Sequence, residues 1–217
     1  KLGDVRPTRR LVKFACQVAA DPDASTPGQT EKWADLKAAY RLIDNADVTF
    51  EAIAGPHWQA TRQQDTGIYL ISCDTTEIDF GWDNEATGLG PLGRGSGRGF
   101  LLHSGLMIHP ETNEVVGLAG QKLRYRKPAP KNESSTRRLT RDRESLVWGE
   151  LIDQIGSPAK GVHFIDICDR GGDNFEVYCK LLLNRHGWIV RAARLNRVVG
   201  YQGEAMSLAD VPSPFSY

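Results

Sequence analysis

The sequence lacks several features that would point its interpretation elsewhere. Its 217 residues contain no run of about 18 apolar residues and no basic stretch followed by an apolar one, so we expect a cytoplasmic protein without a membrane span or signal peptide. The four cysteines show no Cys-x-x-Cys spacing, which argues against zinc and disulfides. The glycine-rich loop Gly88–Gly99 has no Gly-Lys-Ser/Thr and leads into no helix, which excludes a nucleotide-binding P-loop.

Net charge is zero, but the charges are segregated along the chain. The segment from Asp44 to Glu85 is acidic, with Arg62 as its single basic residue. The segment from Lys122 to Arg143 is basic and contains Lys122, Arg124, Arg126, Lys127, Lys131, Arg137, Arg138, Arg141 and Arg143. Cations bind phosphates while carboxylates bind metals, so this pairing is typical of a metal-dependent enzyme that acts on a polyanion. An ordinary solvated surface is the alternative.

Two apolar strands are predicted to end in the same dipeptide, Cys-Asp. They are Ile68–Asp74 and Val162–Asp169. An aspartate at the end of a buried strand is held by a rigid backbone yet faces solvent. Two such carboxylates can share Mg²⁺ or Mn²⁺, which prefer hard oxygen ligands. The pattern therefore predicts a metal site formed by Asp74 and Asp169.

Apolar periodicity divides the chain into three parts. Residues 1–62 are predicted to form a small helical subdomain, interrupted by the turn-rich segment Asp21–Gly28. Residues 63–200 are predicted to alternate strands and helices, and residues 201–217 to be a tail or the start of an insertion. The expected strands are Ile68–Asp74, Phe100–Ile108, Glu114–Arg126, Val162–Asp169 and Trp188–Arg194, and the expected helices are Arg141–Ile155 and Asn174–Asn184.

This order of elements, β-β-β-α-β-α-β, predicts an α/β fold with a mixed sheet of the ribonuclease-H-like type. The first three strands follow one another without helices, which indicates an antiparallel meander. In a ribonuclease-H-like sheet the first and fourth strands lie side by side. We therefore expect Asp74 and Asp169 to be neighbours.

Several segments, taken in order, carry a family resemblance. They are Leu2-Gly3-Asp4 with Arg9-Arg10-Leu11-Val12, Ala39-Tyr40-Arg41-Leu42-Ile43 with Asn45, Asp74-Thr75-Thr76, and Cys168-Asp169-Arg170-Gly171-Gly172-Asp173. The chain resembles the bacterial cut-and-paste DDE transposases of the insertion-sequence type. Their motifs include an N-terminal DNA-binding segment, an AYRF-type helix, DTT and CDREAD. Gly171 and Gly172 stand where that family has Glu-Ala.

The resemblance implies that Asp74 and Asp169 are the first two metal ligands of a DDE triad, which holds Mg²⁺ or Mn²⁺ for DNA cleavage and strand transfer. It implies double-stranded DNA as the partner, a homodimer in the synaptic complex, and a location at the bacterial nucleoid. The candidate DNA-binding residues are Arg6, Arg9, Arg10, Lys122, Arg124, Arg126, Arg170 and Arg191, with Arg194 as a further candidate. Asp173 fits the N-cap of the following helix.

The family's third acidic ligand lies in a Tyr-Arg-x-x-Glu-Lys segment that does not occur before Tyr217. We therefore expect a fragment with an incomplete site, and Glu204 lies too soon after the fifth strand to replace that ligand. One alternative is a non-catalytic DNA-binding module derived from a transposase. Another is a Mg²⁺-dependent phosphohydrolase of the haloacid-dehalogenase type, which requires a parallel sheet and an aspartate at the position of Thr76.

Overall fold

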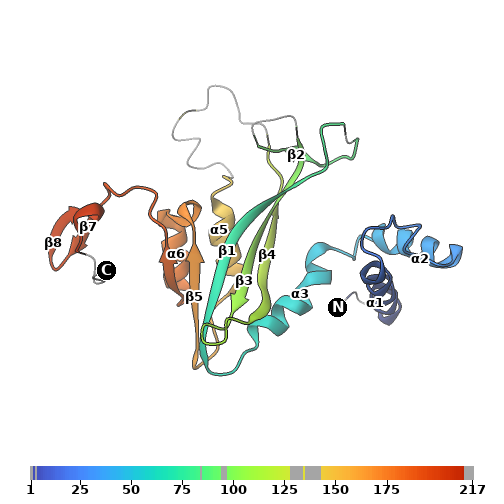
Figure 1. Ribbon diagram of the computed structural model, residues 1–217, viewed down its shortest axis with the longest axis horizontal. Coiled ribbons are helices and arrows are strands. Elements are labelled where there is room, and N and C mark those ends of the chain that lie inside the picture. The colour runs from blue at the N-terminus through green and yellow to red at the C-terminus, as the bar shows by residue number, and fades with distance from the viewer. Residues whose placement is uncertain are drawn as a thin grey trace. The chain divides into compact units, whose positions relative to one another are not determined.

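The computed structural model describes residues 2, 4–83, 85–93, 97–127, 134 and 143–212. The chain divides into two compact units, Lys1–Ala60 and Thr61–Tyr217 (Figure 1). None of the described helices is long and apolar enough to cross a membrane.

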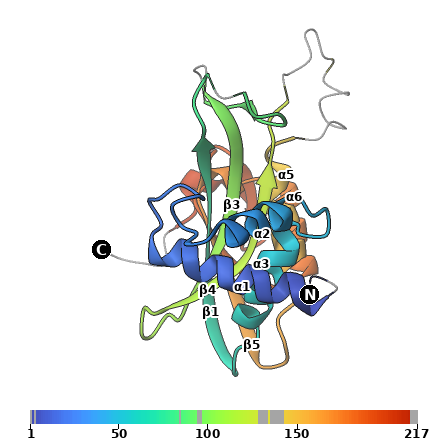
Figure 2. The same cartoon turned by 90° about the vertical axis from the view of Figure 1, so that its right-hand side faces the viewer.

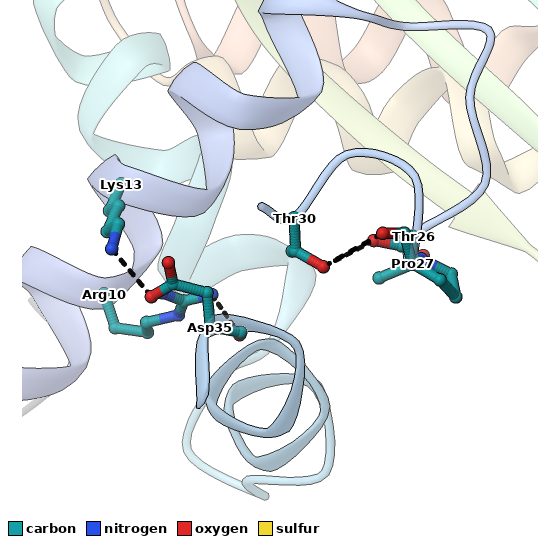
Figure 3. A network of polar contacts seen from close by, with 6 residues as sticks. All are labelled: Arg10, Lys13, Thr26, Pro27, Thr30 and Asp35. Atoms are coloured by element: carbon teal, nitrogen blue, oxygen red, sulfur yellow. Dashed lines mark hydrogen bonds and ion pairs between the residues drawn. The ribbon is translucent and has the colours of Figure 1, made fainter. Parts of the chain in front are cut away.

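The first unit is built from helices α1 (Val5–Ala20), α2 (Trp33–Ile43) and α3 (Phe50–Arg62). Asp4 caps α1, because its carboxylate accepts a hydrogen bond of 2.9 Å from the backbone N–H of Arg6. The predicted break after α1 is confirmed, since residues 21–32 form no α-helix. Within this break, the Thr30 hydroxyl donates to the carbonyls of Thr26 and Pro27 (Figure 3).

The second unit contains a mixed sheet with the strand order β4-β3-β1-β5-β6, and the short strand β2 also pairs with β3. The strands are β1 (Gly67–Asp79), β2 (Gly90–Pro91), β3 (Arg98–Ile108), β4 (Val115–Arg124), β5 (Val162–Cys168) and β6 (Gly187–Val190). β1, β3 and β4 are antiparallel, whereas β1, β5 and β6 are parallel. The predicted neighbourhood of the first and fourth long strands, β1 and β5, is confirmed. The antiparallel β1–β3 pair contradicts the wholly parallel sheet of the phosphohydrolase alternative.

One face of this sheet is covered by α5 (Leu146–Ile155) and α6 (Phe175–Leu183), and the core lies between them and the sheet. Its most deeply buried side chains include Ile71, Met107, Leu151, Val177 and Leu181. Gly105 and Gly120 face each other across β3 and β4 below α5. A Cβ on Gly120 would lie 3.0 Å from Leu151 Cδ1 and 3.2 Å from Ile155 Cγ1, so glycine is what allows this close approach.

Strand β1 is longer than predicted and does not end at Asp74. It continues to Asp79, because its antiparallel partner β3 stays in register from Leu70↔Ile108 to Asp79↔Gly99. Figures 1 and 2 show β1 and β3 as long arrows lying side by side. The parallel pairing with β5, in contrast, stops at Cys73↔Cys168. Asp74 therefore follows the end of the parallel pairing while remaining inside its own strand.

Other predicted boundaries are also corrected. Helix α5 begins at Leu146, because Arg143 and Glu144 form the turn that precedes it, and residues 141–142 lie outside the described residues. β6 ends at Val190, since its only partner β5 stops pairing at Cys168↔Val190. The predicted start of the tail at residue 201 falls inside a hairpin of β7 (Val198–Tyr201) and β8 (Glu204–Ser207), which is followed by the short 3₁₀ helix η2 (Leu208–Asp210).

Candidate functional site

Asp74 and Asp169 lie next to each other across the β1–β5 pair. Each directly follows one member of the last parallel register pair, Cys73↔Cys168. Both cysteines are buried, whereas both aspartates are exposed. The parallel register of β1 and β5 thus brings the two Cys-Asp dipeptides together, as predicted.

One oxygen of each carboxylate is held by the backbone. Asp74 Oδ1 accepts a hydrogen bond of 2.8 Å from the N–H of Thr75. Asp169 Oδ1 accepts one of 2.7 Å from the N–H of Gly171 and caps the 3₁₀ helix η1 (Arg170–Gly172). Neither carboxylate forms an ion pair with a basic side chain in the described ranges. The backbone orients both groups, and their second oxygens remain available to a cation.

The two glycines of the Cys168–Asp173 segment have a steric role. A Cβ on Gly171 would lie 2.9 Å from Trp148 Cζ2, and a Cβ on Gly172 would lie 2.6 Å from Cys168 Cβ. The turn that carries Asp169 therefore packs directly on α5 and β5. A side chain at either position would therefore require Trp148 or Cys168 to shift.

His103 is a buried neutral imidazole beside this site. It is completely buried, and its ring meets the Trp148 ring edge-on at a centroid distance of 4.3 Å. Burial lowers the pKa of His103 to about 4, although the charges of Asp74 and Asp169 both act to raise this pKa. His103 Nδ1 shares a hydrogen bond of 2.7 Å with Thr75 Oγ1, while Nε2 has no hydrogen-bond partner among the described residues. Both carboxylates thus act electrostatically on one imidazole, which agrees with their proximity in the register.

A second buried polar group, the pair Asp166 and His186, lies beside Cys73. Asp166 and His186 have fully buried side chains and are joined by a 2.6 Å contact between Oδ2 and Nδ1. His186 Nε2 lies 2.9 Å from the carbonyl oxygen of Gly156, so both ring nitrogens face acceptors. Burial lowers the pKa of His186, but Asp166 and this carbonyl outweigh it and the pKa is raised. Cys73 Sγ lies 3.7 Å from Asp166 Oδ1, which links this pair to the strands carrying the aspartates.

Sequence reasoning missed the Asp166–His186 pair. The available signal was a charged residue at an inward position of an otherwise apolar strand, which requires a buried partner.

The predicted basic residues of α1 differ in their surroundings. Arg9 is exposed, and Arg6 pairs with Asp4 at 2.8 Å while remaining largely in solvent. Arg10 is mostly buried and, together with Lys13, forms ion pairs with Asp35 of α2 (Figure 3). The structure therefore gives Arg10 a role in holding α1 to α2, and Arg9 is exposed without an ion pair to a described residue.

The described part of the basic tract is largely neutralised. Arg124 pairs with Glu150 at 3.2 Å and donates to the carbonyl of Arg143 at 2.7 Å. Arg126 lies between Glu144 and Glu77, at 2.7 Å and 2.8 Å, and these contacts raise its pKa. The half-buried Lys122 forms no ion pair with a described residue. Four further basic residues of this tract, Lys131, Arg137, Arg138 and Arg141, lie outside the described residues.

Arg170 and Arg191 are exposed, and the backbone of each lies near that of Asp169. Arg170 follows Asp169 directly, and the N–H of Arg191 donates to the carbonyl of Cys168 at 2.9 Å.

The expectation that Asp173 caps the next helix is wrong. Asn174 caps α6, because its side chain accepts a hydrogen bond of 3.0 Å from the N–H of Val177. Asp173 is buried instead and accepts from the Tyr178 hydroxyl at 2.9 Å and the Ala193 N–H at 2.6 Å, and it pairs with Arg197 at 2.5 Å. Ala193 and Arg197 lie 20 and 24 residues further along the chain, so local sequence reasoning does not reach these two contacts.

Within the described ranges, no group of three or more His, Cys, Asp or Glu side chains is arranged to hold a metal ion. Asp74 and Asp169 supply two hard oxygen donors on rigid backbone, which fits part of a Mg²⁺ or Mn²⁺ site.

Comparison with known families gives one match. Residues 1–48 match the family model described as transposase DNA-binding. Among the curated proteins, no match to the chain is found. Residues 1–48 are thus similar to a transposase DNA-binding segment, and this match supports DNA as a partner of the chain.

Proposed function

We propose that the chain is part of a DDE transposase of the bacterial insertion-sequence type. In this proposal the helical unit binds transposon-end DNA, and Asp74 and Asp169 are two of the three acidic ligands for Mg²⁺ or Mn²⁺. The observation that carries the proposal is the β1–β5 register, which brings the two aspartates together in a chain whose first residues match a transposase DNA-binding family. The strand order supports a ribonuclease-H-like core, because an antiparallel β4-β3-β1 meander continues into the parallel strands β5 and β6.

The residues of the chain would prepare the reaction by orientation. Thr75 and Gly171 fix one oxygen of each carboxylate, so that the other oxygens of Asp74 and Asp169 would hold the cation. When bound, such a cation lowers the pKa of water and stabilises the charge that develops in phosphoryl transfer. Arg170 and Arg191 would contact the DNA backbone beside Asp169. Two protein ligands hold a divalent ion weakly, so we expect slow cleavage until a third carboxylate joins the site.

A DNA-binding assay tests the first half of this proposal. Duplexes carrying the terminal inverted repeats that flank the gene, and random duplexes of equal length, are titrated with the protein in an electrophoretic assay. We expect preferential binding to the repeats, and affinity weaker by on the order of tenfold after Arg9→Gln, because a charged contact to phosphate is lost. Arg185→Gln removes an equally exposed arginine at the far end of α6 and serves as the matched control. Equal affinity for both duplexes would contradict end recognition.

A cleavage assay tests the second half. Nicking of the same duplexes with Mn²⁺ should disappear in both Asp74→Asn and Asp169→Asn, while DNA binding persists. Nicking that survives in either variant would contradict the assigned roles. The second candidate function is a non-catalytic DNA-binding module, favoured by the restriction of the family match to residues 1–48. Specific binding without any nicking, even when a third acidic ligand is supplied by the complete gene product, would establish that candidate instead.

We further propose that two copies of the protein act together on paired DNA ends, at the bacterial nucleoid. Light scattering of the purified protein with end DNA tests the dimer. A complex with the mass of two protein chains is expected, whereas a single chain per duplex at all concentrations would contradict it.

A further inference from the structure

A polar cavity lies between the N-terminus of α6 and the connection from β6 to β7, one turn along the chain from Asp169. Its volume is about 640 Å³, and it is lined by Asp173, Asn174, Ala193, Arg194, Asn196 and Arg197. Figure 1 shows this connection leading from the sheet to the β7–β8 hairpin. None of its lining residues belongs to the β1–β5 register pairs or to residues 1–48, which match the transposase DNA-binding family.

The wall of the cavity is fixed from two sides. On one side, the carboxylate of Asp173 accepts from the Ala193 N–H and pairs with Arg197, which joins the connection to α6. On the other side, the N–H groups of Leu208 and Ala209 donate to the carbonyls of Arg197 and Leu195 at 2.8 Å and 2.9 Å. The connection is therefore tied at both ends before any ligand arrives.

The only carboxylate in the lining is already neutralised. The Asp173 side chain is fully buried. Its carboxylate forms an ion pair with Arg197 and accepts hydrogen bonds from the Tyr178 hydroxyl and the Ala193 N–H. Burial raises the pKa of Asp173, but these hydrogen bonds outweigh it and the pKa is lowered, so this carboxylate stays ionised within its pair.

Arg194 is then the unbalanced charge of the cavity. It is exposed and forms no ion pair with a described residue, and the Asn196 side chain adds an amide donor. A cavity with one spare guanidinium, amide donors and a neutralised carboxylate favours a phosphate-sized anion.

The cavity lies one tight turn from Asp169. The N–H of Gly172 donates to the carbonyl of Asp169 at 3.1 Å, and the N–H of Asp173 donates to the carbonyl of Arg170 at 3.3 Å. The other wall begins at Arg191, whose N–H is bonded to Cys168. The turn Asp169–Asp173 on one side, and the hydrogen bond from Arg191 to Cys168 on the other, fix the cavity relative to Asp169.

We infer that this cavity is a second phosphate subsite, in which Arg194 and Asn196 hold a backbone phosphate of the same DNA whose scissile phosphate is presented to Asp74 and Asp169. This inference rests on the proposed function, because DNA is taken as the ligand. Asp173 acts as a positioning residue, since it reaches the ligand only through Arg197 and the backbone of Ala193. The subsite would keep the DNA in register with the carboxylates.

The test measures DNA affinity by fluorescence anisotropy over a range of salt concentrations. Arg194→Gln is compared with wild type, with the charge-preserving Arg194→Lys, and with Arg185→Gln as the matched control for loss of an exposed arginine. We expect Arg194→Gln to weaken binding by on the order of tenfold and to reduce the slope of log affinity against log salt by about 1, because one phosphate contact is lost. Arg194→Lys should restore the slope, and Arg185→Gln should behave as wild type.

The outcomes separate this inference from the proposed function. If wild type binds DNA and Arg194→Gln behaves like Arg185→Gln, the subsite is refuted while the proposed function stands. If wild type does not bind DNA, both fail. Asp173→Asn provides a second measurement. It makes the cavity more positive by one charge, which by itself favours DNA, but it removes the carboxylate that joins Arg197 to the Ala193 N–H. We expect weaker DNA binding, because the wall that positions Arg194 is loosened. Circular dichroism of each variant shows whether the fold is kept, and an Asp173→Asn protein that is folded and binds as wild type would refute the positioning role.

Discussion

Acid should destabilise this protein through His103, and the size of the effect follows from its burial. The pKa of His103 falls from the ordinary value of 6.5 to about 4 in the folded protein. The unfolded chain therefore binds a proton at a pH where the folded protein does not. The stabilisation is fully present above the unfolded pKa and is lost as pH falls towards the folded one. The linkage relation gives a loss of about 2.5 kcal/mol between pH values of roughly 7.5 and 4.5.

The effect of His103 is isolated by comparison with His103→Gln, which does not titrate. Urea unfolding of both proteins is measured at the two pH values, so that contributions of the carboxylates common to both cancel. His186 contributes with the opposite sign: its raised pKa gives stability that is present below the unfolded pKa and is lost as pH rises through the folded one, but it is also common to both proteins. We expect the stability difference between wild type and variant to change by about 2.5 kcal/mol. A difference that is the same at both pH values would refute the assignment of His103 as a buried neutral imidazole.

Further predictions concern packing and buried pairs. Gly120→Ala should lower the free energy of unfolding in urea by about 1–3 kcal/mol, because the added Cβ meets the α5 side chains. The control Gly200→Ala adds a Cβ with no atom within 4 Å and should change this free energy little. Equal effects of the two substitutions would contradict the packing of α5. Asp166→Asn should cost about 1–3 kcal/mol, since it removes the buried carboxylate that faces the ring nitrogen of His186, and a loss below about 0.5 kcal/mol would contradict this buried contact. Asp35→Asn should speed amide hydrogen exchange in α1, and unchanged exchange would show that its ion pairs do not hold that helix.

The order of elements could be predicted because it depends on local periodicity. Leu146–Ile155 and Phe175–Leu183 fall inside the predicted helices, and the strands around Cys73 and Cys168 lie where apolar runs placed them. The end of β1 could not be predicted, because it is decided by hydrogen bonds to β3, whose register is a long-range property.

The candidate site follows the same division. The neighbourhood of Asp74 and Asp169 could be predicted from strand order, since parallel neighbours bring equivalent positions together. The states of Arg124 and Arg126 could not, because their glutamate partners lie on other elements and charge counting along the chain does not reveal them. Asp173 was misassigned for a similar reason: its contacts with Ala193 and Arg197 form only when the β6–β7 connection folds back on α6.

If Asp74 and Asp169 form one cation site, a Mn²⁺ titration monitored by electron paramagnetic resonance should detect it. Wild type is compared with Asp74→Asn, Asp169→Asn and Asp65→Asn, the last of which removes an exposed carboxylate from the loop before β1. We expect a weak Mn²⁺ site that is lost in both Asp74→Asn and Asp169→Asn and kept in Asp65→Asn. Mn²⁺ binding that persists when either aspartate is replaced would contradict it.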